Sequence, residues 1–290
     1  MDKKAEGYLF ISLPIIIIGT FLIYPILASF IMSFQTKETN VFTLANYKRL
    51  LTDDVFVKTL FNTFIFLIIQ VPFMLFLGLM IAYILNQKQI KGRSFFTFFF
   101  FLPAVTSLVS YSAIFKMMFQ INGVINQFLI KVNLIAQPID WLQTVNGARF
   151  VVIVALCWRW TGYNMIFYLS ALQQLPVAQF EAAAIDGATK RQQFFHLILP
   201  QLKPIILFTS ITSTIGTLQL FDEVVNLTNG GPSHATMTVS QLIYNHSFVY
   251  GNNFHYAATL SWALVLIISV LSIFQLYGTT DLANKRRIKR

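Results

Sequence analysis

The sequence predicts an all-α, polytopic membrane protein with six transmembrane helices and a helix-turn-helix segment on the cytoplasmic side. Only 11% of the 290 residues are charged, against roughly 25% in soluble domains, and the mean hydropathy is +0.65. Several uncharged runs exceed the roughly 18 residues that indicate a membrane-spanning helix. These runs cover residues 7–36, 59–87, 94–115, 150–180 with Arg159 as the one interruption, 204–221, and 224–280, which holds histidines but no other charged residue type.

We expect the six spans at residues 8–34, 61–86, 95–119, 149–174, 204–223 and 256–279. Prolines fall inside three of them, at Pro14, Pro25, Pro72 and Pro103. A proline within a membrane helix frees backbone groups that neighbouring helices or water must satisfy. These prolines suit a kinked bundle around a central path, and they suit ordinary packing kinks equally well.

The first span is expected to be retained. Lys3 and Lys4 before an apolar run resemble the start of a signal peptide. The run is much longer than the roughly 7–15 apolar residues of a signal peptide, and no clear small-residue cleavage site follows it.

The connecting segments differ in character. Residues 87–93 form a short basic loop, whereas residues 35–58 and 120–148 are longer and lie on the outer side. In the last of these, Asn122-Gly123 precedes apolar residues at helical spacing, namely Val124, Ile125, Phe128, Leu129 and Val132. We expect a helix at the outer membrane interface, which either forms part of a docking surface or covers the rim of the bundle.

The distribution of lysine and arginine predicts the orientation. With the N-terminus inside, thirteen of the 21 fall on the inner side, including Lys88, Lys91 and Arg93 of the short loop; seven fall outside and Arg159 lies within a span. This excess places both termini in the cytoplasm. The net charge of +10 therefore indicates membrane orientation rather than nucleic-acid binding.

The chain contains little that carries chemistry. There is no G-x-x-x-x-G-K-[ST] phosphate loop, so ATP binding of the usual kind is not expected, and the four histidines lack metal-ligand spacing. Cys157 is the only cysteine, which excludes an intrachain disulfide and multi-cysteine zinc sites. We expect no enzyme activity, cofactor or metal in this chain. Acidic residues are missing from the span centres, which disfavours a proton-driven carrier, while sodium sites can still be built from carbonyls.

Arg159 is the exception among the spans, because a cation at this depth is costly and usually faces the bundle interior or water. It stands between Trp158 and Trp160, with Tyr163 and Asn164 about one turn further on. Aromatic faces beside amide and guanidinium donors suit a polyhydroxylated ligand such as a sugar. The alternative is that Arg159 snorkels or bonds a backbone carbonyl. The candidate path residues are Arg159, Trp158, Tyr163, Asn164, Asn62, Gln70, Tyr111 and Gln219.

A polar insertion separates the fourth and fifth spans. Pro176 suits the first turn of a new helix, and the alanine-rich stretch after Phe180 is strongly helix-forming. Gly187 can adopt the left-handed conformation that ends such a helix. Lys190 begins a second short helix that Pro200 closes. This geometry fits a rigid contact element for a cytoplasmic partner, and it fits an amphipathic interfacial hairpin equally well.

The insertion resembles the EAA loop of binding-protein-dependent ABC importer permeases. The family pattern is E-A-A, three residues, G, nine residues, I, one residue, L-P. The matching positions are Glu181, Ala182, Ala183, Gly187, Leu197, Leu199 and Pro200, with Leu197 in place of the usual isoleucine. The resemblance marks Glu181, Ala182, Ala183, Asp186, Gly187, Leu199 and Pro200 as ATPase-coupling residues, within a loop at residues 175–203 of a single permease domain spanning residues 1–290.

The resemblance covers nearly the whole chain and is closest to the carbohydrate-uptake branch. The matching stretches are Tyr24-Pro25, FTLANYKRLL from Phe42, LPAVTSLVS from Leu102, INGVINQFL from Ile121 and LTNGGPSHATMT from Leu227. Within that branch, Phe221-Asp222 and the stretch from Asn229 to Pro232 resemble the MalF-like or UgpA-like subunit in its compact form.

The resemblance implies a transport subunit that moves a sugar, most simply an oligosaccharide, by alternating access. It also implies a second permease, two ATPase subunits that hold ATP and magnesium, an external sugar-binding protein, and a bacterial or archaeal cell membrane. The same machinery with glycerol phosphate or another polyol derivative as cargo is an alternative. An ion-driven secondary carrier is the alternative from another class.

Overall fold

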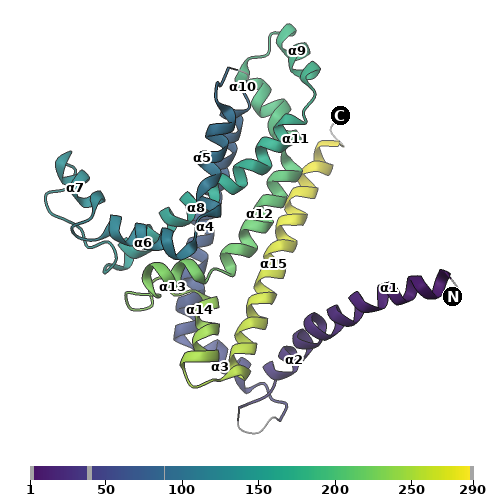
Figure 1. Cartoon of the computed structure of the whole chain (residues 1–290), viewed down its shortest axis with the longest axis vertical. Helices are drawn as coiled ribbons and strands as arrows, with labels where there is room; N and C mark the ends of the chain where they lie inside the picture. The colour runs from purple at the N-terminus through teal and green to yellow at the C-terminus, as the bar shows by residue number, and fades with distance from the viewer. Residues whose placement is uncertain (1–2, 38–40, 88, 288–290) are drawn as a thin grey trace. The chain divides into compact units, whose positions relative to one another are not determined.

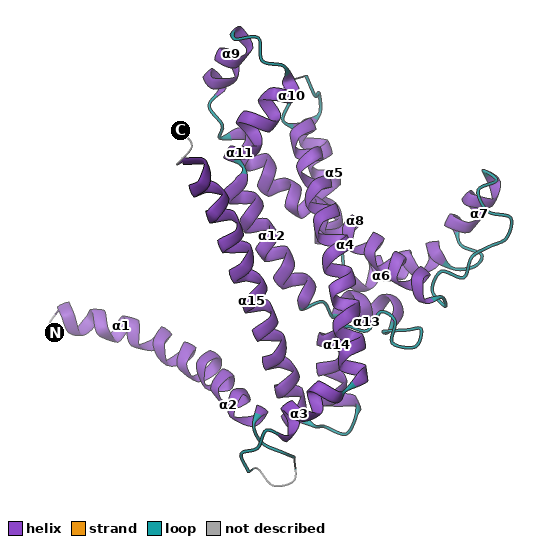
Figure 2. Cartoon of the chain, turned by 180° about the vertical axis from the view of Figure 1, so that it is seen from behind, coloured by secondary structure: helices purple, strands orange, loops and turns teal. Residues whose placement is uncertain are grey.

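The computed structural model describes residues 3–37, 41–87 and 89–287, with side chains placed only between residues 11 and 277 of that range. Lys88, Lys289 and Arg290, which count toward the expected inner charge, lie outside the described residues. Among the described residues the regular structure is helical, apart from one isolated bridge between Gln35 and Phe42. Helices joined by loops are what Figure 2 shows, and the all-α prediction is confirmed.

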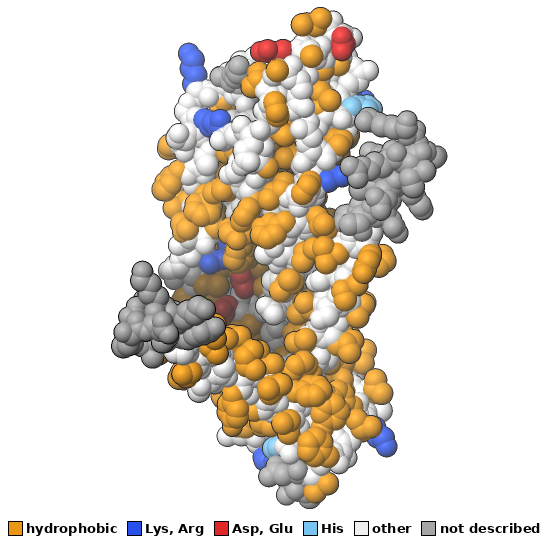
Figure 3. Space-filling view, turned by 90° about the vertical axis from the view of Figure 1, so that its right-hand side faces the viewer, with side chains coloured by type: hydrophobic (Ala, Val, Ile, Leu, Met, Phe, Trp, Pro, Cys, Tyr) orange, Lys and Arg blue, Asp and Glu red, His pale blue; other side chains and the backbone are white. Residues whose placement is uncertain are grey.

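By length and composition, five helical segments of the described chain can cross a membrane, and six can if one bent pair counts as a single span. The five are Ile11–Ser33, Asp54–Leu85, Leu108–Lys131, Val145–Gln173 and Phe254–Tyr277. The bent pair is Lys190–Gln201 with Lys203–Leu218, at an angle of 64°. Hydrophobic side chains cover much of the face in Figure 3, as a surface in contact with lipid requires.

The third expected span, residues 95–119, is broken. α5 (Arg93–Val105) ends near Pro103, and α6 (Leu108–Phe119) begins only after Thr106, whose backbone is extended. Pro103 has no N–H to continue the helical ladder. Its carbonyl instead accepts hydrogen bonds from the Thr106 N–H at 3.4 Å and from Thr106 Oγ1 at 2.7 Å. The sequence therefore predicts the apolar length correctly, but the continuous helix is wrong.

The chain divides into two compact units, residues 1–57 with 242–267 and residues 58–241 with 268–290. The expectation of a single permease domain stays a prediction. The first unit contains α1 (Lys3–Ile18), a π-helical turn (Gly19–Ile23), α2 (Tyr24–Ser33), α3 (Ala45–Thr52), a second π-helical turn (Asn245–Val249) and the start of α15 (Phe254–Arg287).

Within the first unit, Asp53 joins the start of α4 (Asp54–Leu85) to α15. Its Oδ1 accepts from the N–H groups of Val55 and Phe56, and its Oδ2 accepts from the Tyr256 hydroxyl at 2.6 Å. Burial raises the pKa of Asp53, but these three bonds and nearby Arg49 outweigh it, so the pKa lies below its ordinary value. The carboxylate thus caps α4 in its charged form.

The second unit contains most of the remaining helices, which Figure 1 labels. They are α5, α6, α7 (Val124–Lys131), α8 (Val145–Gln173), α9 (Val177–Ile185), α10 (Lys190–Gln193), a π-helical turn (Phe194–Ile198), α11 (Leu199–Gln201), α12 (Lys203–Leu218) and α13 (Asp222–Thr228). α14 (Val239–Tyr244) begins in this unit. The fifth expected span, residues 204–223, ends earlier than predicted, at Leu218.

α8 is the central helix of the second unit. Over half of its most apolar window is buried, 56%, against 28–33% for α4, α15 and the Leu108–Lys131 segment. Its N-terminal half packs with Phe66 and with the aromatic residues of α6 and the apolar face of α13. Its C-terminal half packs with α4 and with Ile198 and Leu202, just before α12. Residues that α8 presents are therefore held on several sides.

The backbones of α5 and α8 meet at Gly162. A Cβ atom built there would lie 1.8 Å from the carbonyl oxygen of Phe100. Small residues at helix crossings allow this close approach in membrane proteins, where van der Waals packing replaces much of the hydrophobic driving force. This contact fixes the position of α8 next to the broken third span.

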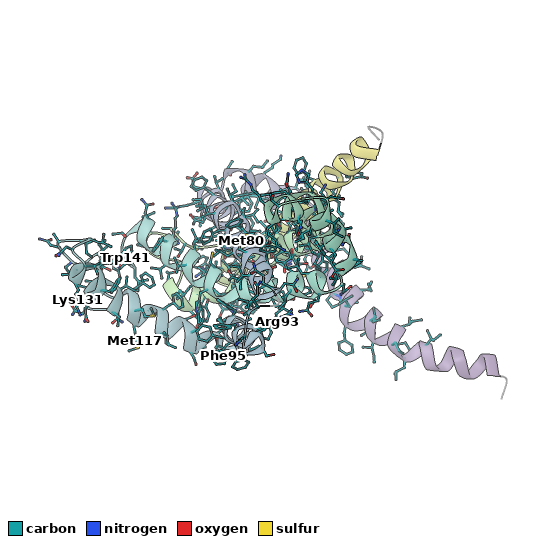
Figure 4. All side chains as sticks on the ribbon, turned by 90° about the horizontal axis from the view of Figure 1, so that it is seen from above. Met80, Arg93, Phe95, Met117, Lys131 and Trp141 are labelled. Carbon is teal, nitrogen blue, oxygen red and sulfur yellow. The ribbon has the colours of Figure 1, made fainter. Side chains whose placement is uncertain are left out.

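The helix predicted after Asn122-Gly123 is present as α7, while its place at the outer membrane interface stays a prediction. Asn126 holds it in place: its amide nitrogen donates to the carbonyls of Gln120, Ile121 and Ile139, and its oxygen accepts from the indole N–H of Trp141 at 3.0 Å. Figure 4 shows Lys131 and Trp141 together in this region, away from Met80. Whether this segment serves as a docking surface stays a prediction.

Candidate functional site

A cavity of about 510 Å³ lies among α4, α6, α8, α12 and α13, and we call it the Arg159 cavity. Five of the eight predicted path residues line it, namely Gln70, Arg159, Tyr163, Asn164 and Gln219. The structure thus brings together residues that lie up to 149 positions apart in the sequence. Figure 3 shows acidic side chains within a hollow of an otherwise mainly apolar face.

Arg159 is only 8% exposed. It makes the backbone bond that one interpretation predicts, while its role in a substrate path stays a prediction. Its Nη1 donates to the carbonyl of Thr106 at 3.1 Å, at the break between α5 and α6. Its guanidinium carbon lies 5.0 Å from the ring centre of Tyr111. The Nε is buried and has no hydrogen-bond partner among the described residues. The guanidinium therefore donates a hydrogen bond to the backbone at the α5–α6 break, and the same side chain also lines the cavity.

Trp160 and Tyr163 form an aromatic corner in the cavity wall. Their ring centres are 5.7 Å apart and the rings are nearly perpendicular, at 89°. The indole N–H of Trp160 donates to Glu223 Oε1 at 3.2 Å. Such a corner offers flat apolar faces to a ligand beside polar groups.

Glu223 is a site residue that the sequence reasoning missed. It is 6% exposed and lines the cavity together with Asp222. It lies in α13, beyond the end of the fifth span. Burial raises the pKa of its carboxyl, while the bond from Trp160 and the charge of Arg159 lower it, and the net direction is upward. A pair of acids directly after an apolar run was the available signal.

The remaining polar wall is cross-linked. Thr217 Oγ1 donates to Gln70 Oε1 at 3.0 Å, and Ser213 Oγ donates to Asn164 Oδ1 at 3.4 Å. The Asn164 amide nitrogen donates to the Trp160 carbonyl one turn earlier at 3.0 Å. These bonds fix the amides that α4 and α8 present, because a held side chain positions its remaining donors and acceptors.

Three predicted path residues lie elsewhere. Asn62 donates to the carbonyls of His234 and Met237 at 2.7 and 3.0 Å, and accepts from Arg149 Nη2 at 2.7 Å. It therefore braces the loop before α14. Tyr111 is 2% exposed and packs against Arg159 from behind.

Trp158 is 44% exposed and lines a different, more apolar cavity of about 960 Å³ between α4, α5 and α8. Adjacent helix positions point in different directions, about 100° apart. Of the two tryptophans beside Arg159, it is Trp160 that faces the Arg159 cavity.

The predicted coupling loop, residues 175–203, contains the two short helices that the sequence indicates. α9 (Val177–Ile185) ends just before Gly187, which has the expected left-handed conformation with φ +78°. The Ala188 N–H donates to the Ala183 carbonyl at 2.9 Å, and the Gly187 N–H to that of Ala184 at 3.1 Å, the pattern of a glycine-terminated helix. Thr189 and Gln192 then form a capping box that starts α10.

The outer surface of this loop has an exposed apolar residue. Ile185 is 87% exposed, on the same short helix as exposed Glu181 and Ala182. Asp186 and Gly187 border a small cleft of about 380 Å³ between α9 and the second helix. A large side chain so exposed next to small ones suits a contact with another protein. The sequence reasoning did not single out Ile185, although an isoleucine directly before Asp-Gly was visible.

The second helix of the loop is anchored to the bundle. Leu199 and Pro200 are partly buried, and Ile198 and Leu202 belong to the core that α4 and α8 form. Residues 190–201 then continue through one bend into α12. α12 in turn contributes Thr212, Ser213, Gly216 and Thr217 to the wall of the Arg159 cavity.

These features together define a multi-pass membrane transport protein: apolar spans, a buried charged group beside an internal cavity, and an exposed helical loop connected to the cavity wall. The chain belongs to the family of binding-protein-dependent transport system inner membrane components, since a sequence model of that family matches residues 53–281.

Characterised relatives match almost end to end. The lactose transport system permease protein LacF of Rhizobium radiobacter is 46% identical over 281 residues, 95% of this chain and 94% of its own. The arabinooligosaccharides transport system permease protein AraP of Halalkalibacterium halodurans is 34% identical, covering 96% and 89%. The multiple sugar-binding transport system permease protein MsmF of Streptococcus mutans is 34% identical, covering 94% and 95%.

Solved structures confirm the fold. A crystal structure of a bacterial ABC transporter involved in the import of the acidic polysaccharide alginate matches with a TM-score of 0.84 at 22% identity, covering 100% of this chain and 98% of that one. A second structure, of a bacterial alginate transporter in complex with an alginate pentasaccharide-bound periplasmic protein, matches with a TM-score of 0.83 at 21% identity.

Proposed function

We propose that this chain is the permease subunit of an ATP-driven importer that moves a sugar, most simply an oligosaccharide, across the cell membrane by alternating access. The observation that supports this most directly is the continuity of the coupling loop with α12. One element thereby connects an exposed contact surface to the wall of the Arg159 cavity. The names of the relatives, which concern lactose, arabinooligosaccharides and multiple sugars, support a sugar as cargo.

The partners in this proposal are a second permease, two ATPase subunits and an external sugar-binding protein. The chain has no phosphate-loop motif, so ATP and magnesium belong to the ATPases. The binding-protein complex of the structural neighbour supports the external partner. Both termini face the cytoplasm of a bacterial or archaeal cell, as the lysine and arginine distribution favours.

The mechanism requires an element whose contacts differ between two states. α9, with Glu181, Ala182, Ala183 and exposed Ile185, docks on an ATPase. When the ATPases close on ATP, the displacement of α9 passes through the anchored second helix to α12. The cavity then opens outward to receive the sugar, and hydrolysis returns it inward.

Reconstitution tests this function. Proteoliposomes that hold the permease pair and both ATPases are supplied with the binding protein and radiolabelled lactose outside. They are expected to accumulate lactose only when ATP is enclosed in the lumen, on the side of the ATPases. A matched preparation without the ATPases serves as the control. Lactose flux in that control would select an ion-driven carrier, and uptake of glycerol phosphate in place of lactose would select the alternative cargo.

Replacing Arg159 with alanine is expected to lower sugar uptake at least tenfold and to affect complex assembly much less. Among the described residues, the substitution removes the one basic group of the cavity wall. It leaves the Thr106 carbonyl as an unsatisfied buried acceptor, at a cost of about 1–3 kcal/mol. Uptake and the yield of assembled complex are measured on the same membranes. Arg149→Ala, which removes the brace to Ala235 and Asn62, is the contrast and should reduce assembly. Loss of assembly in Arg159→Ala with no separate uptake defect would favour a purely structural role.

A further inference from the structure

The described side chains that line the Arg159 cavity carry no net positive formal charge, even though a buried arginine is among them. Its lining includes one basic side chain, Arg159, and two acidic ones, Asp222 and Glu223. Arg159 and Glu223 are both more than nine-tenths buried, at 8% and 6% exposure, whereas Asp222 is exposed. Interactions between charges in such a partly desolvated site are strong compared with those in water.

Part of the Arg159 guanidinium is already hydrogen-bonded within the protein. Its Nη1 donates to the Thr106 carbonyl, while its Nε has no partner among the described residues. The Nε–H is therefore a buried donor that a ligand hydroxyl or ring oxygen could accept from. Because this edge of the guanidinium could also bind an anion, any preference against anionic sugars must come from Asp222 and Glu223.

Glu223 is held where it faces the same space. The Trp160 indole N–H fixes its Oε1, and Trp160, Tyr163 and Glu223 all line the cavity. A pyranose lying against the aromatic corner would therefore place its hydroxyls near carboxylate acceptors. A sugar that carries its own carboxylate or phosphate would place that charge near exposed Asp222, and near Glu223 in its ionised form.

We propose that Glu223, with Asp222, makes the Arg159 cavity selective for uncharged sugars over sugars that carry a carboxylate or a phosphate. This rests on the proposed function and adds the substrate class to it. It also disfavours glycerol phosphate as the cargo. Glu223 acts as a specificity-determining residue, through its charge and not only through its hold on Trp160.

The test compares two ligands that differ at one group, which is a neutral hydroxymethyl in one and a carboxylate in the other. The assembled complex of both permeases and the ATPases is placed in lipid nanodiscs at pH 7.5 without the binding protein. Radiolabelled lactose is bound, and then displaced by unlabelled lactose or by its analogue with the outer hydroxymethyl group oxidised to a carboxylate. The analogue is expected to compete at least about tenfold less well than lactose, and Glu223→Gln should reduce that ratio by about tenfold.

Two further variants separate charge from placement. Glu223→Asp keeps the charge and should keep most of the discrimination. Trp160→Phe removes the indole N–H but keeps the carboxylate, and should weaken both ligands together. Equal competition by the two ligands in the wild type, an unchanged ratio in Glu223→Gln, or a ratio lost in Trp160→Phe would each overturn the proposal.

The failure of the inference is distinguishable from the failure of the proposed function. Absence of saturable binding for both lactose and a neutral arabinotriose, together with no ATP-driven uptake, removes the proposed function and the inference with it. Binding and uptake without discrimination by charge remove the inference alone.

Discussion

Replacing Gly187 with proline is expected to reduce ATP-driven sugar uptake to background while the protein still inserts and the ATPases still hydrolyse ATP. Gly187 has φ +78°, whereas proline is restricted to about −65°. Proline also removes the N–H that donates to the Ala184 carbonyl at the end of α9. The orientation of α9 relative to the second loop helix must therefore change. Uptake and ATP hydrolysis by the same proteoliposomes measure the coupling ratio.

Controls distinguish this effect from general damage. Gly92→Pro makes the same change at another left-handed glycine, φ +74°, in the short loop before α5 and outside the coupling loop. It should not uncouple the complexes that assemble. Glu181→Lys changes an exposed side chain of α9 without disturbing the backbone and should uncouple as well. Normal uptake in both Gly187→Pro and Glu181→Lys would remove the coupling role from this loop.

Gly162→Ala is expected to cause a severe loss of folded protein, because the α5–α8 crossing has no space for a methyl group. The added Cβ would lie 1.8 Å from a backbone oxygen, that of Phe100, and 3.2 Å from the Cα of Phe101. Backbone cannot rotate away as a side chain can, so the helices must separate. Overpacking costs typically about 1–3 kcal/mol and occasionally more, and we expect the upper end here. The yield of detergent-stable protein and its thermal melting measure the effect.

Gly216→Ala is the matched control. Gly216 is also helical, in α12, and a Cβ built there meets nothing within 4 Å. Alanine has the better helix propensity by about 1 kcal/mol, so this variant should match or exceed the wild type in stability. If Gly162→Ala and Gly216→Ala behaved alike, the close crossing would not be needed for the fold.

The sequence predicts the membrane class and the two short helices of residues 175–203 well, for a physical reason. Long uncharged runs and the turn chemistry of Gly187, Thr189 and Pro200 act locally, so they are visible without knowledge of the fold. The interruption at Thr106 is less visible, since membrane helices often tolerate a proline such as Pro103. Whether the proline kinks or ends the helix depends on which groups form hydrogen bonds with the freed backbone. One such donor, Arg159, comes from another helix and is not visible in the local sequence.

The candidate site is predictable only in part. Arg159, Tyr163 and Asn164 could be found because an arginine in an apolar span is conspicuous. Asn62 is likewise a polar residue in an apolar span. Its amide nitrogen, however, donates to the carbonyls of His234 and Met237, which are 172 and 175 positions away. No sequence pattern reports such long-range satisfaction of hydrogen bonds. Trp158 and Trp160 point to different sides of α8. The sequence does not show which side faces the cavity, because it does not show where the neighbouring helices lie.

If cargo binds in the Arg159 cavity, the bond from Arg159 to the Thr106 carbonyl limits what Nη1 can add to its binding. A ligand that recruits Nη1 must displace that carbonyl, which is then left unsolvated at the helix break. Part of any contact to Nη1 would thus be offset by an internal loss, which would favour release of the cargo. Weak binding suits a transport permease, because cargo that is bound too tightly would not be released on the far side of the membrane.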